Sequence, residues 1–253
     1  LSSVERYDPA LDAWETVDPM ATARSRHAVA VLDGKLYAVG GTNPNDGSLS
    51  SAERYEPALD VWEEVAPMAT PRMNHTVAVL DGKLYAVGGF NEHDDNLSSV
   101  ERYDPALDAW EAVVPMAAAR DYHAVAVLDG KLYAVGGTNP NDGSLSSAER
   151  YEPALDVWEE VAPMATPRVN HAVAMIDGKL YAVGGYTNGV ISSVERYDPT
   201  LDAWEAVAPM ARCGARVSRA VAVLDGKLRR PPQLGGAVRP GGAWEAVATL
   251  AEG

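Results

Sequence analysis

The sequence predicts an all-β protein made of repeated four-stranded antiparallel sheets, arranged as the blades of a propeller. Similar residues recur about every 48 positions, and each copy ends a short apolar run in a double glycine before a Glu-Arg-Tyr and a tryptophan. A fixed period of this length is typical of propellers and solenoids, whose units bury apolar surface only by stacking on one another. An Asp-Gly-Lys-Leu segment marks the successive copies, beginning at Asp33, Asp81, Asp129, Asp177 and Asp225.

Residues 69–116 show how one copy predicts four strands. The runs 76–80 and 84–87 are apolar and are joined through Asp-Gly, a pair that favours a tight hairpin turn. A variable polar loop follows the double glycine, and two further strands are expected at 98–103 and 109–113. The first two strands use small residues and the last two carry Tyr and Trp, as expected if the former lie near a crowded axis.

The repeats predict one domain over residues 1–253 with about five blades. The strands in residues 1–17 and 218–228 are expected to pair and complete the fifth blade. After Lys227 the expected Leu-Tyr-Ala-Val-Gly-Gly becomes Leu-Arg-Arg-Pro-Pro-Gln, and proline cannot donate to a sheet ladder, which predicts a degenerate end. The expected units are residues 1–20 (third and fourth strands of the closing blade), the whole blades 21–68, 69–116, 117–164 and 165–210, and a partial, degenerate blade 211–253.

Two stretches are identical residue for residue, namely 27–72 and 123–168. This identity indicates a recent two-blade duplication or an engineered array. Part of any binding surface is therefore presented twice.

Composition narrows the classes of partner. A net charge of −15 argues against nucleic acid or an anionic membrane, because both require a basic face. Cys213 is the single cysteine, which excludes an intrachain disulfide and favours a cytoplasmic location. The chain begins in mid-repeat at Leu1 rather than Met, so we expect the natural N-terminus and any targeting signal to lie outside it.

Histidine and arginine each recur once per blade. A ring of imidazoles near an axis could bind a metal, but each histidine falls where a first strand begins, so we expect a structural role, no metal and no cofactor. A ring of guanidinium groups could hold an acidic ligand, but we expect these groups to fix carbonyls between blades. The residues concerned are His27, His75, His123 and His171, with Arg219 in the fifth copy, and Arg24, Arg72, Arg120, Arg168 and Arg216.

Four segments of one copy together resemble the Kelch motif. They are Arg72-x-x-His75, the 84–89 segment Leu-Tyr-Ala-Val-Gly-Gly, the 100–105 segment Val-Glu-Arg-Tyr-Asp-Pro, and the 110–116 segment Trp-x-x-Val-x-Pro-Met. The sequence pattern most resembles that of the Kelch-like substrate adaptors of cullin-based ubiquitin ligases, and the resemblance covers residues 1 to about 228. The family usually has six blades, so this chain is either an unusual five-bladed ring or has lost one blade.

The resemblance implies a protein-binding surface on one rim of the propeller. In Kelch-like adaptors, partners contact the loop between strands two and three and the segment that leads into strand one. Phe90, Tyr122 and Tyr186 are aromatic residues at these positions, and aromatic side chains are enriched among interface anchors. The predicted partner-binding residues are Arg26, Asn74, Phe90, Asn96, Asp121, Tyr122, Asn170 and Tyr186.

Three functions remain open at this stage. The first is capture of a peptide segment of a substrate for a cullin-based ligase, whose BTB and BACK regions are not in this chain. The second is an actin or cytoskeletal scaffold, and the third is a carbohydrate-active propeller, an oxidase or mutarotase. Enzymatic activity is not expected, because Cys213 has no supporting His and Tyr ligands and the carboxylates recur in turns and outer strands.

Overall fold

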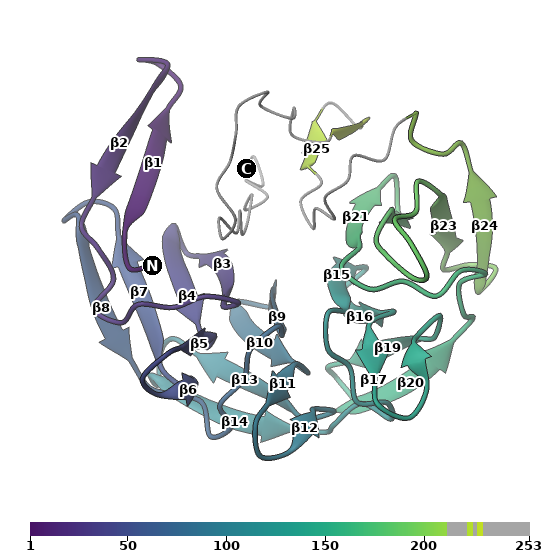
Figure 1. The fold of residues 1–253 in the computed structure, drawn as a ribbon, viewed down its shortest axis with the longest axis horizontal. Coiled ribbons are helices and arrows are strands. Elements are labelled where there is room, and N and C mark those ends of the chain that lie inside the picture. Colours follow the sequence, from purple (N-terminus) through teal and green to yellow (C-terminus); the bar gives the residue numbers. More distant parts are fainter. Residues whose placement is uncertain (212–221, 225–226, 230–253) are drawn as a thin grey trace.

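The computed structural model describes residues 1–211, 222–224 and 227–229. Within them lie four four-stranded antiparallel sheets, one for each predicted whole blade, which we call blades A to D in chain order. The blades follow one another in an arc around a common centre (Figure 1). The part of the chain described contains no helix long and apolar enough to cross a lipid bilayer.

Each blade uses its strands in chain order from the centre outward. Blade A contains β3 (Ala28–Leu32), β4 (Lys35–Val39), β7 (Ala52–Glu56) and β8 (Val61–Val65). Blade B contains β9 (Thr76–Leu80), β10 (Lys83–Val87), β13 (Val100–Asp104) and β14 (Ala109–Val113). Blade C contains β15 (Ala124–Leu128), β16 (Lys131–Val135), β19 (Ala148–Glu152) and β20 (Val157–Val161). Blade D contains β21 (Ala172–Ile176), β22 (Lys179–Val183), β23 (Val194–Asp198) and β24 (Ala203–Val207).

The Asp-Gly turn sets the register of the first two strands. Asp81 and Gly82 have φ values of 51° and 69°, the left-handed conformation of a primed hairpin turn. Leu84 consequently pairs with Val79, and on the other side of β10 it pairs with Tyr103. The four strands predicted within 69–116 are confirmed, with ends shifted by at most two residues.

The core lies between blades. Val39 and Val65 of blade A pack with Leu84, Ala86 and Tyr103 of blade B in one buried cluster. Equivalent clusters join B to C and C to D. This arrangement explains why one repeat cannot bury its own apolar surface.

Tryptophans fasten neighbouring blades to each other. The indole of Trp110 in blade B packs against the A–B cluster, and its Nε1 donates to the carbonyl of Ala66 at 2.9 Å. Trp158 and Trp204 donate in the same way to Val114 and Ala162. Each of these tryptophans therefore fills the gap between two blades and hydrogen-bonds to the backbone of the preceding blade.

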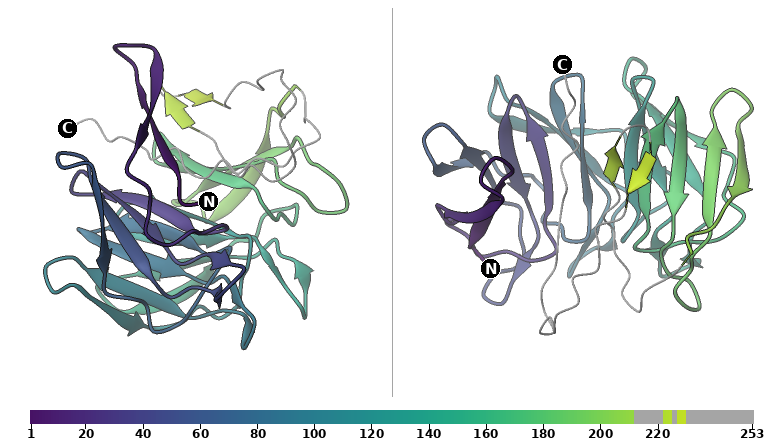
Figure 2. Two further views of the ribbon diagram at one scale, coloured as in Figure 1. Left: turned by 60° about the vertical axis from the view of Figure 1, so that its left-hand side comes forward. Right: turned by 90° about the horizontal axis from the view of Figure 1, so that it is seen from above.

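The expected fifth blade is not one sheet. β1 (Val4–Asp8) pairs with β2 (Ala13–Val17), and β25 (Ala222–Leu224) pairs with β26 (Lys227–Arg229), as two separate two-stranded sheets. The prediction that 1–17 and 218–228 join in one sheet is thus wrong for the residues described. The β1–β2 hairpin extends beside blade A, whereas β25 lies near β21 of blade D (Figures 1 and 2). Most of the predicted degenerate segment 211–253 lies outside the described residues.

The two ends of the blades differ in what they carry. In blade A, the turn 33–34 and the turn 57–60 lie at the same end, because Leu36 pairs with Tyr55. We call this end, with its equivalents in the other blades, the turn face. The opposite end, which we call the loop rim, carries the segments after each double glycine and the segments leading into each first strand. These segments are 42–50, 90–98, 138–146 and 186–192, and 24–27, 72–75, 120–123 and 168–171.

Candidate functional site

The loop rim is built from short hairpins that the sequence did not predict. They follow the double glycines of blades A, B and C as β5 (Thr42–Asn43) with β6 (Gly47–Ser48), β11 (Phe90–Asn91) with β12 (Asp95–Asn96), and β17 (Thr138–Asn139) with β18 (Gly143–Ser144). In blade D the shorter loop is closed by a single bridge between Tyr186 and Val190.

An asparagine folds each of these hairpins. The Oδ1 of Asn91 accepts the backbone N–H groups of His93 and Asp94 at 2.9 and 2.6 Å. Its Nδ2 donates to the Asp94 carboxylate and to the carbonyl of Pro71, both at 3.1 Å. Such side-chain bonding to backbone two or three residues ahead defines an Asx turn. The recurring Asn-x-x-Asp at 43–46, 91–94 and 139–142 was the sequence signal for the hairpins.

The two segments predicted to form the rim lie side by side. The first residue after each double glycine forms a β-bridge with the residue that follows the recurring arginine. In blade B, the N–H groups of Met73 and Phe90 donate to each other's carbonyls, each at 2.9 Å. The bridges are Ser25 with Thr42, Met73 with Phe90, Asp121 with Thr138, and Val169 with Tyr186.

The next residue along has a left-handed backbone in all four blades. Arg26, Asn74, Tyr122 and Asn170 have φ values of 56°, 52°, 53° and 53°. This conformation is uncommon for residues other than glycine and asparagine, and it is often found at functional sites. The Asn74 N–H donates to the Arg26 carbonyl, and the Asn170 N–H to the Tyr122 carbonyl, both at 3.0 Å. Two of these bonds therefore link the rim of blade A to that of blade B and the rim of blade C to that of blade D.

The predicted partner-binding residues divide into exposed and buried groups. Arg26 is exposed, Tyr186 is 43% exposed, and Phe90, Tyr122 and Asn170 are partly buried. These five present surface on the rim.

Asn74 and Asp121 are buried instead. Their exposed fractions are 4% and 6%, and the Asn74 Nδ2 lies 3.5 Å from the Asp121 Oδ2. The Nδ2 of Asn96 donates to the Thr138 carbonyl in blade C at 2.8 Å. In this conformation these three side chains join blades, which corrects the expectation that they all face a partner.

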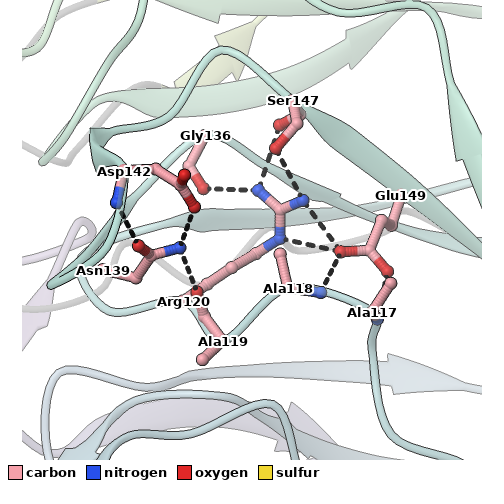
Figure 3. Close-up of polar contacts among 9 residues, drawn as sticks. All are labelled: Ala117, Ala118, Ala119, Arg120, Gly136, Asn139, Asp142, Ser147 and Glu149. Atoms are coloured by element: carbon pink, nitrogen blue, oxygen red, sulfur yellow. Dashed lines mark hydrogen bonds and ion pairs between the residues drawn. The ribbon is translucent and has the colours of Figure 1, made fainter.

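A buried ion pair lies beneath the rim of each whole blade. In blade C, Arg120 donates from Nη1 to the carbonyls of Gly136 at 2.9 Å and Ser147 at 3.0 Å, and from Nη2 to Glu149 at 2.8 Å (Figure 3). Glu149 also accepts the N–H groups of Ala117 and Ala118 at 2.7 and 3.1 Å. The arginine and glutamate thus tie the segment between blades to the blade that follows.

The remaining pairs repeat this arrangement. They are Arg24 with Glu53, Arg72 with Glu101 and Arg168 with Glu195, each at 2.7 Å with almost no side-chain exposure. Burial opposes ionisation of Glu195, but its hydrogen bonds from Arg168 and Ala165 hold its pKa below the usual value. The recurring arginines are structural, as expected, although their carbonyl acceptors lie within one blade rather than between blades. Arg216 lies outside the described residues.

The histidines pack under the double glycines. A Cβ on Gly88 would lie 2.7 Å from the Arg120 carbonyl oxygen and 3.0 Å from Cε1 of His123, which explains why glycine stands there. Burial, reinforced by Arg24, lowers the pKa of His27 to about 4. Across the described residues no group of three or more His, Cys, Asp or Glu is placed to hold a metal ion. Arg219 and Cys213 lie outside them.

The rim surface is acidic. Five carboxylate residues on its hairpins are exposed, whereas Arg26 is the exposed cationic residue on the described rim. The Glu92 carboxylate accepts the Ser48 N–H at 3.2 Å across the A–B junction, and hydrogen bonding from Ser48, from its side chain first and its backbone second, lowers the Glu92 pKa. The exposed carboxylate residues are Asp46, Glu92, Asp94, Asp95 and Asp142.

Comparisons with known proteins agree on the fold and the repeat. The family model of the KLHDC2/KLHL20/DRC7 Kelch-repeats domain matches residues 26–229. The solved structure of YjhT superposes with a TM-score of 0.76 at 15% identity, covering 90% of this chain and 83% of that one. That likeness shows the fold, a Kelch propeller.

Curated relatives match over single repeats. The Influenza virus NS1A-binding protein homolog of Mus musculus is 49% identical over 49 residues, which are 19% of this chain and 8% of that protein. Kelch-like protein 4 of Homo sapiens is 55% identical over 38 residues, 15% of this chain and 5% of that protein. The matched segments therefore span less than a tenth of the length of these relatives.

Proposed function

We propose that this chain, which belongs to the KLHDC2/KLHL20/DRC7 Kelch-repeats family, holds a segment of a partner protein on its loop rim. Kelch domains are generally protein-binding modules. In this role the chain recognises substrates for a cullin-based ubiquitin ligase in the cytoplasm and carries out no catalysis of its own.

The observation that supports the rim is where sequence differences fall. The hairpin after the double glycine has one sequence in blades A and C and other sequences in B and D, and the two residues after the recurring arginine differ in all four blades. These segments form adjacent bridges on one end of the blades. A surface whose scaffold is constant and whose exposed positions vary is suited to recognising one particular partner.

The chemistry of this surface favours a basic segment with an apolar anchor. Its exposed carboxylates outnumber its exposed cations five to one in the described residues. Complementary charge accelerates encounter and fixes the register of a bound chain. The same rim also exposes apolar side chains, namely Tyr186 (43% exposed) and Val190 (38% exposed). A buried aromatic contact is a common source of binding energy.

The adaptor role is supported by short matches to Kelch-like proteins, which cover one repeat each. Co-precipitation of a cullin with the full-length protein tests the adaptor role separately. If no cullin co-precipitates while a partner segment still binds the rim, the chain acts as a scaffold rather than as a ligase adaptor.

Selection from a random peptide display library tests the binding function. We expect the enriched peptides to combine Lys or Arg with an aromatic or aliphatic residue. The double variant Asp94→Asn and Asp95→Asn should weaken a selected peptide by about tenfold, with a shallower dependence on salt, because each removes an exposed charge.

The matched control is Glu63→Gln on the outer strand β8, whose side chain is 49% exposed and pairs with Arg54. It removes one carboxylate far from the rim and should leave affinity unchanged. Enrichment of acidic peptides, or equal loss in the control, would contradict the proposal.

A further inference from the structure

Blades A and C carry the same rim hairpin, whereas blades B and D carry other sequences. Residues 27–72 and 123–168 are identical, and this stretch contains both hairpins whole, 42–48 and 138–144. Blade B has Phe-Asn-Glu-His-Asp-Asp-Asn at the same position, and blade D has a shorter loop. A ligand group that fits one of the two identical hairpins therefore finds a second position of the same sequence two blades away.

The two hairpins also have the same conformation. In blade A, the Asn43 Oδ1 accepts the N–H groups of Asn45 and Asp46 at 2.9 and 2.8 Å, and the Asn43 Nδ2 donates to the Asp46 carboxylate at 2.9 Å. In blade C, the corresponding distances from Asn139 are 3.0, 2.8 and 3.0 Å. The glycine that closes each turn has a φ of 69° in both blades. The identical sequences therefore present the same backbone.

The exposed part of each hairpin is its Pro-Asn-Asp segment, which we call the tip. The tips are residues 44–46 in blade A and 140–142 in blade C, and all six residues are exposed. One oxygen of each aspartate accepts a hydrogen bond from the hairpin's asparagine, which orients the carboxylate. An oriented carboxylate is a good partner for a basic group, and an arginine can meet it with two parallel hydrogen bonds. Each tip is therefore suited to one basic side chain of a ligand.

Blade B holds the two hairpins in place on both sides. Glu92 in its own hairpin accepts the N–H of Ser48, the last residue of the blade A hairpin, at 3.2 Å. Asn96, at the other end of the same hairpin, donates to the carbonyl of Thr138, the first residue of the blade C hairpin, at 2.8 Å. When two sites are fixed in this way, a ligand bound at one site has a raised effective concentration at the other.

The surface between the two tips is acidic. The blade B hairpin exposes Glu92, Asp94 and Asp95. A ligand segment that crosses this hairpin is favoured if it is basic or neutral and disfavoured if it is acidic, because like charges at an interface repel. The connecting segment and the two ends of such a ligand thus have the same charge requirement.

We propose that the tips of blades A and C are two matching subsites that together hold one polypeptide with two copies of the same basic motif. The inference rests on the proposed function, because it places the bound segment on the same rim. Each copy contacts one tip through a Lys or Arg side chain, and the segment between the copies crosses blade B. A two-copy ligand therefore binds more tightly than either copy alone.

The surroundings of the two tips differ at the segment that leads into the first strand. Arg26 lies at this position in blade A and Tyr122 in blade C. The Arg26 guanidinium lies 3.7 Å from the Met73 sulfur of blade B, and it remains exposed. Its charge repels a basic ligand, although solvent and salt screen the repulsion. We therefore expect the tip of blade C to bind one motif more tightly than the tip of blade A, by less than about tenfold.

The probe is a peptide obtained by two selections. A random display library is first enriched on the full chain and then depleted on the double variant Asp46→Ser and Asp142→Ser. The depletion leaves peptides that need these two carboxylates, and we expect them to contain at least one Lys or Arg. If every enriched peptide also binds the double variant, the tips are not subsites and the inference fails.

Titration calorimetry of the full chain counts the subsites. The selected single-motif peptide should bind with two peptides per protein. A tandem peptide, in which two copies are joined by Gly-Ser linkers of graded length, should bind with one peptide per protein. At its best linker length its affinity should exceed that of the single motif by at least about tenfold.

Single variants assign the two bound peptides to the two tips. Asp46→Ser or Asp142→Ser alone should leave one single-motif peptide per protein and should remove the tandem advantage. The matched control combines Glu63→Gln and Glu159→Gln, two carboxylates of the same duplicated stretch that lie on the outer strands β8 and β20 and are about half exposed. This control removes the same charge from the same two blades and should change neither the number bound nor the tandem advantage.

Two further results would overturn the inference. One is a single peptide per protein in the unmodified chain. The other is a tandem advantage that survives either single substitution or is lost in the control. Both results leave one rim site, and so the proposed function, standing. Failure of every library peptide to bind the rim would instead overturn the proposed function and this inference together.

Discussion

The loop rim and the turn face are made from the same repeats but have different structural support. On the turn face, each blade repeats the same Asp-Gly and Pro-x-Leu-Asp turns, and one leucine per outer hairpin stays exposed, between 68% and 75%. On the rim, hairpins of differing sequence stand over a buried layer of Arg, Glu, His and glycine. The comparison teaches that surface sequence can vary where buried groups beneath it hold the backbone.

The buried layer can do this because its partners are mostly backbone atoms. Arg120 binds the carbonyls of Gly136 and Ser147, and Glu149 binds the N–H groups of Ala117 and Ala118. None of these bonds depends on the side chains of the hairpin above. On the turn face the turn residues supply the support themselves, since Asp108 accepts the Tyr103 hydroxyl at 2.8 Å and the Ala66 N–H of the preceding blade at 2.9 Å.

The largest expected effect follows from breaking one buried pair. Glu149→Ala leaves Arg120 charged, buried and unmatched and strips two N–H groups of their acceptor, so we expect a loss of about 3–5 kcal/mol in unfolding free energy. Glu159→Ala in the same blade removes the partner of Arg150 at a surface pair and should cost less than about 1 kcal/mol. Urea denaturation of both variants gives the comparison, and equal costs would contradict it.

Two glycine-to-alanine substitutions compare how tightly the backbone is held at the rim end and at the turn end of blade B. Gly88→Ala under the rim meets the Arg120 carbonyl at 2.7 Å and should cost about 2–4 kcal/mol through strain and overpacking. Gly82→Ala on the turn face has nothing within 4 Å of the new Cβ, so about 1 kcal/mol from its φ of 69° is expected. Thermal melts that rank the two variants in the reverse order would show that the rim is not the constrained end.

Exposed apolar residues at the two ends sharpen the functional comparison. Tyr186 is 43% exposed on the rim and Leu201 is 74% exposed on the turn face. Tyr186→Ala should weaken a selected peptide by about tenfold, because it removes an anchor. Leu201→Ala removes exposed apolar surface from the turn face and should leave peptide affinity unchanged. Titration calorimetry measures the affinity of both variants. Loss of affinity in the Leu201 variant alone would move the binding site to the turn face.

The smallest effect concerns pH and the histidine layer. Burial lowers the pKa of His27 to about 4 from the usual 6.5, so the folded state favours the neutral ring. The contribution of neutral His27 to the unfolding free energy is therefore fully present above pH 6.5. It is lost as the pH falls toward 4, because the unfolded chain takes up the proton first. Between pH 7 and pH 5 we expect a loss on the order of 1 kcal/mol that His27→Gln removes. An identical pH profile in that variant would assign the loss to other groups.

The blades could be predicted because their signals are local. Asp-Gly turns and apolar runs locate β9 and β10, and the repeat period supplies the rest. The short rim hairpins were missed because two-residue polar strands lack a hydrophobic pattern, although Asn91 and Asp94 marked the turn between them.

Features that depend on contacts between blades could not be read from the chain. Asn74 and Asp121 were predicted to face a partner, but each is buried by the neighbouring blade's rim segment. Closure of the fifth blade was expected from matching sequences at both ends. Among the described residues each end pairs only within itself, β1 with β2 and β25 with β26, and the positions after Arg229 lie outside those residues.

Hydrogen exchange of the chain with and without a selected basic peptide tests the central claim most directly. The account predicts added protection confined to the rim segments 42–50, 90–98, 120–123 and 186–192, with no change in the turns 57–60, 105–108 and 199–202. Added protection in those turns, with the rim segments unchanged, would contradict it.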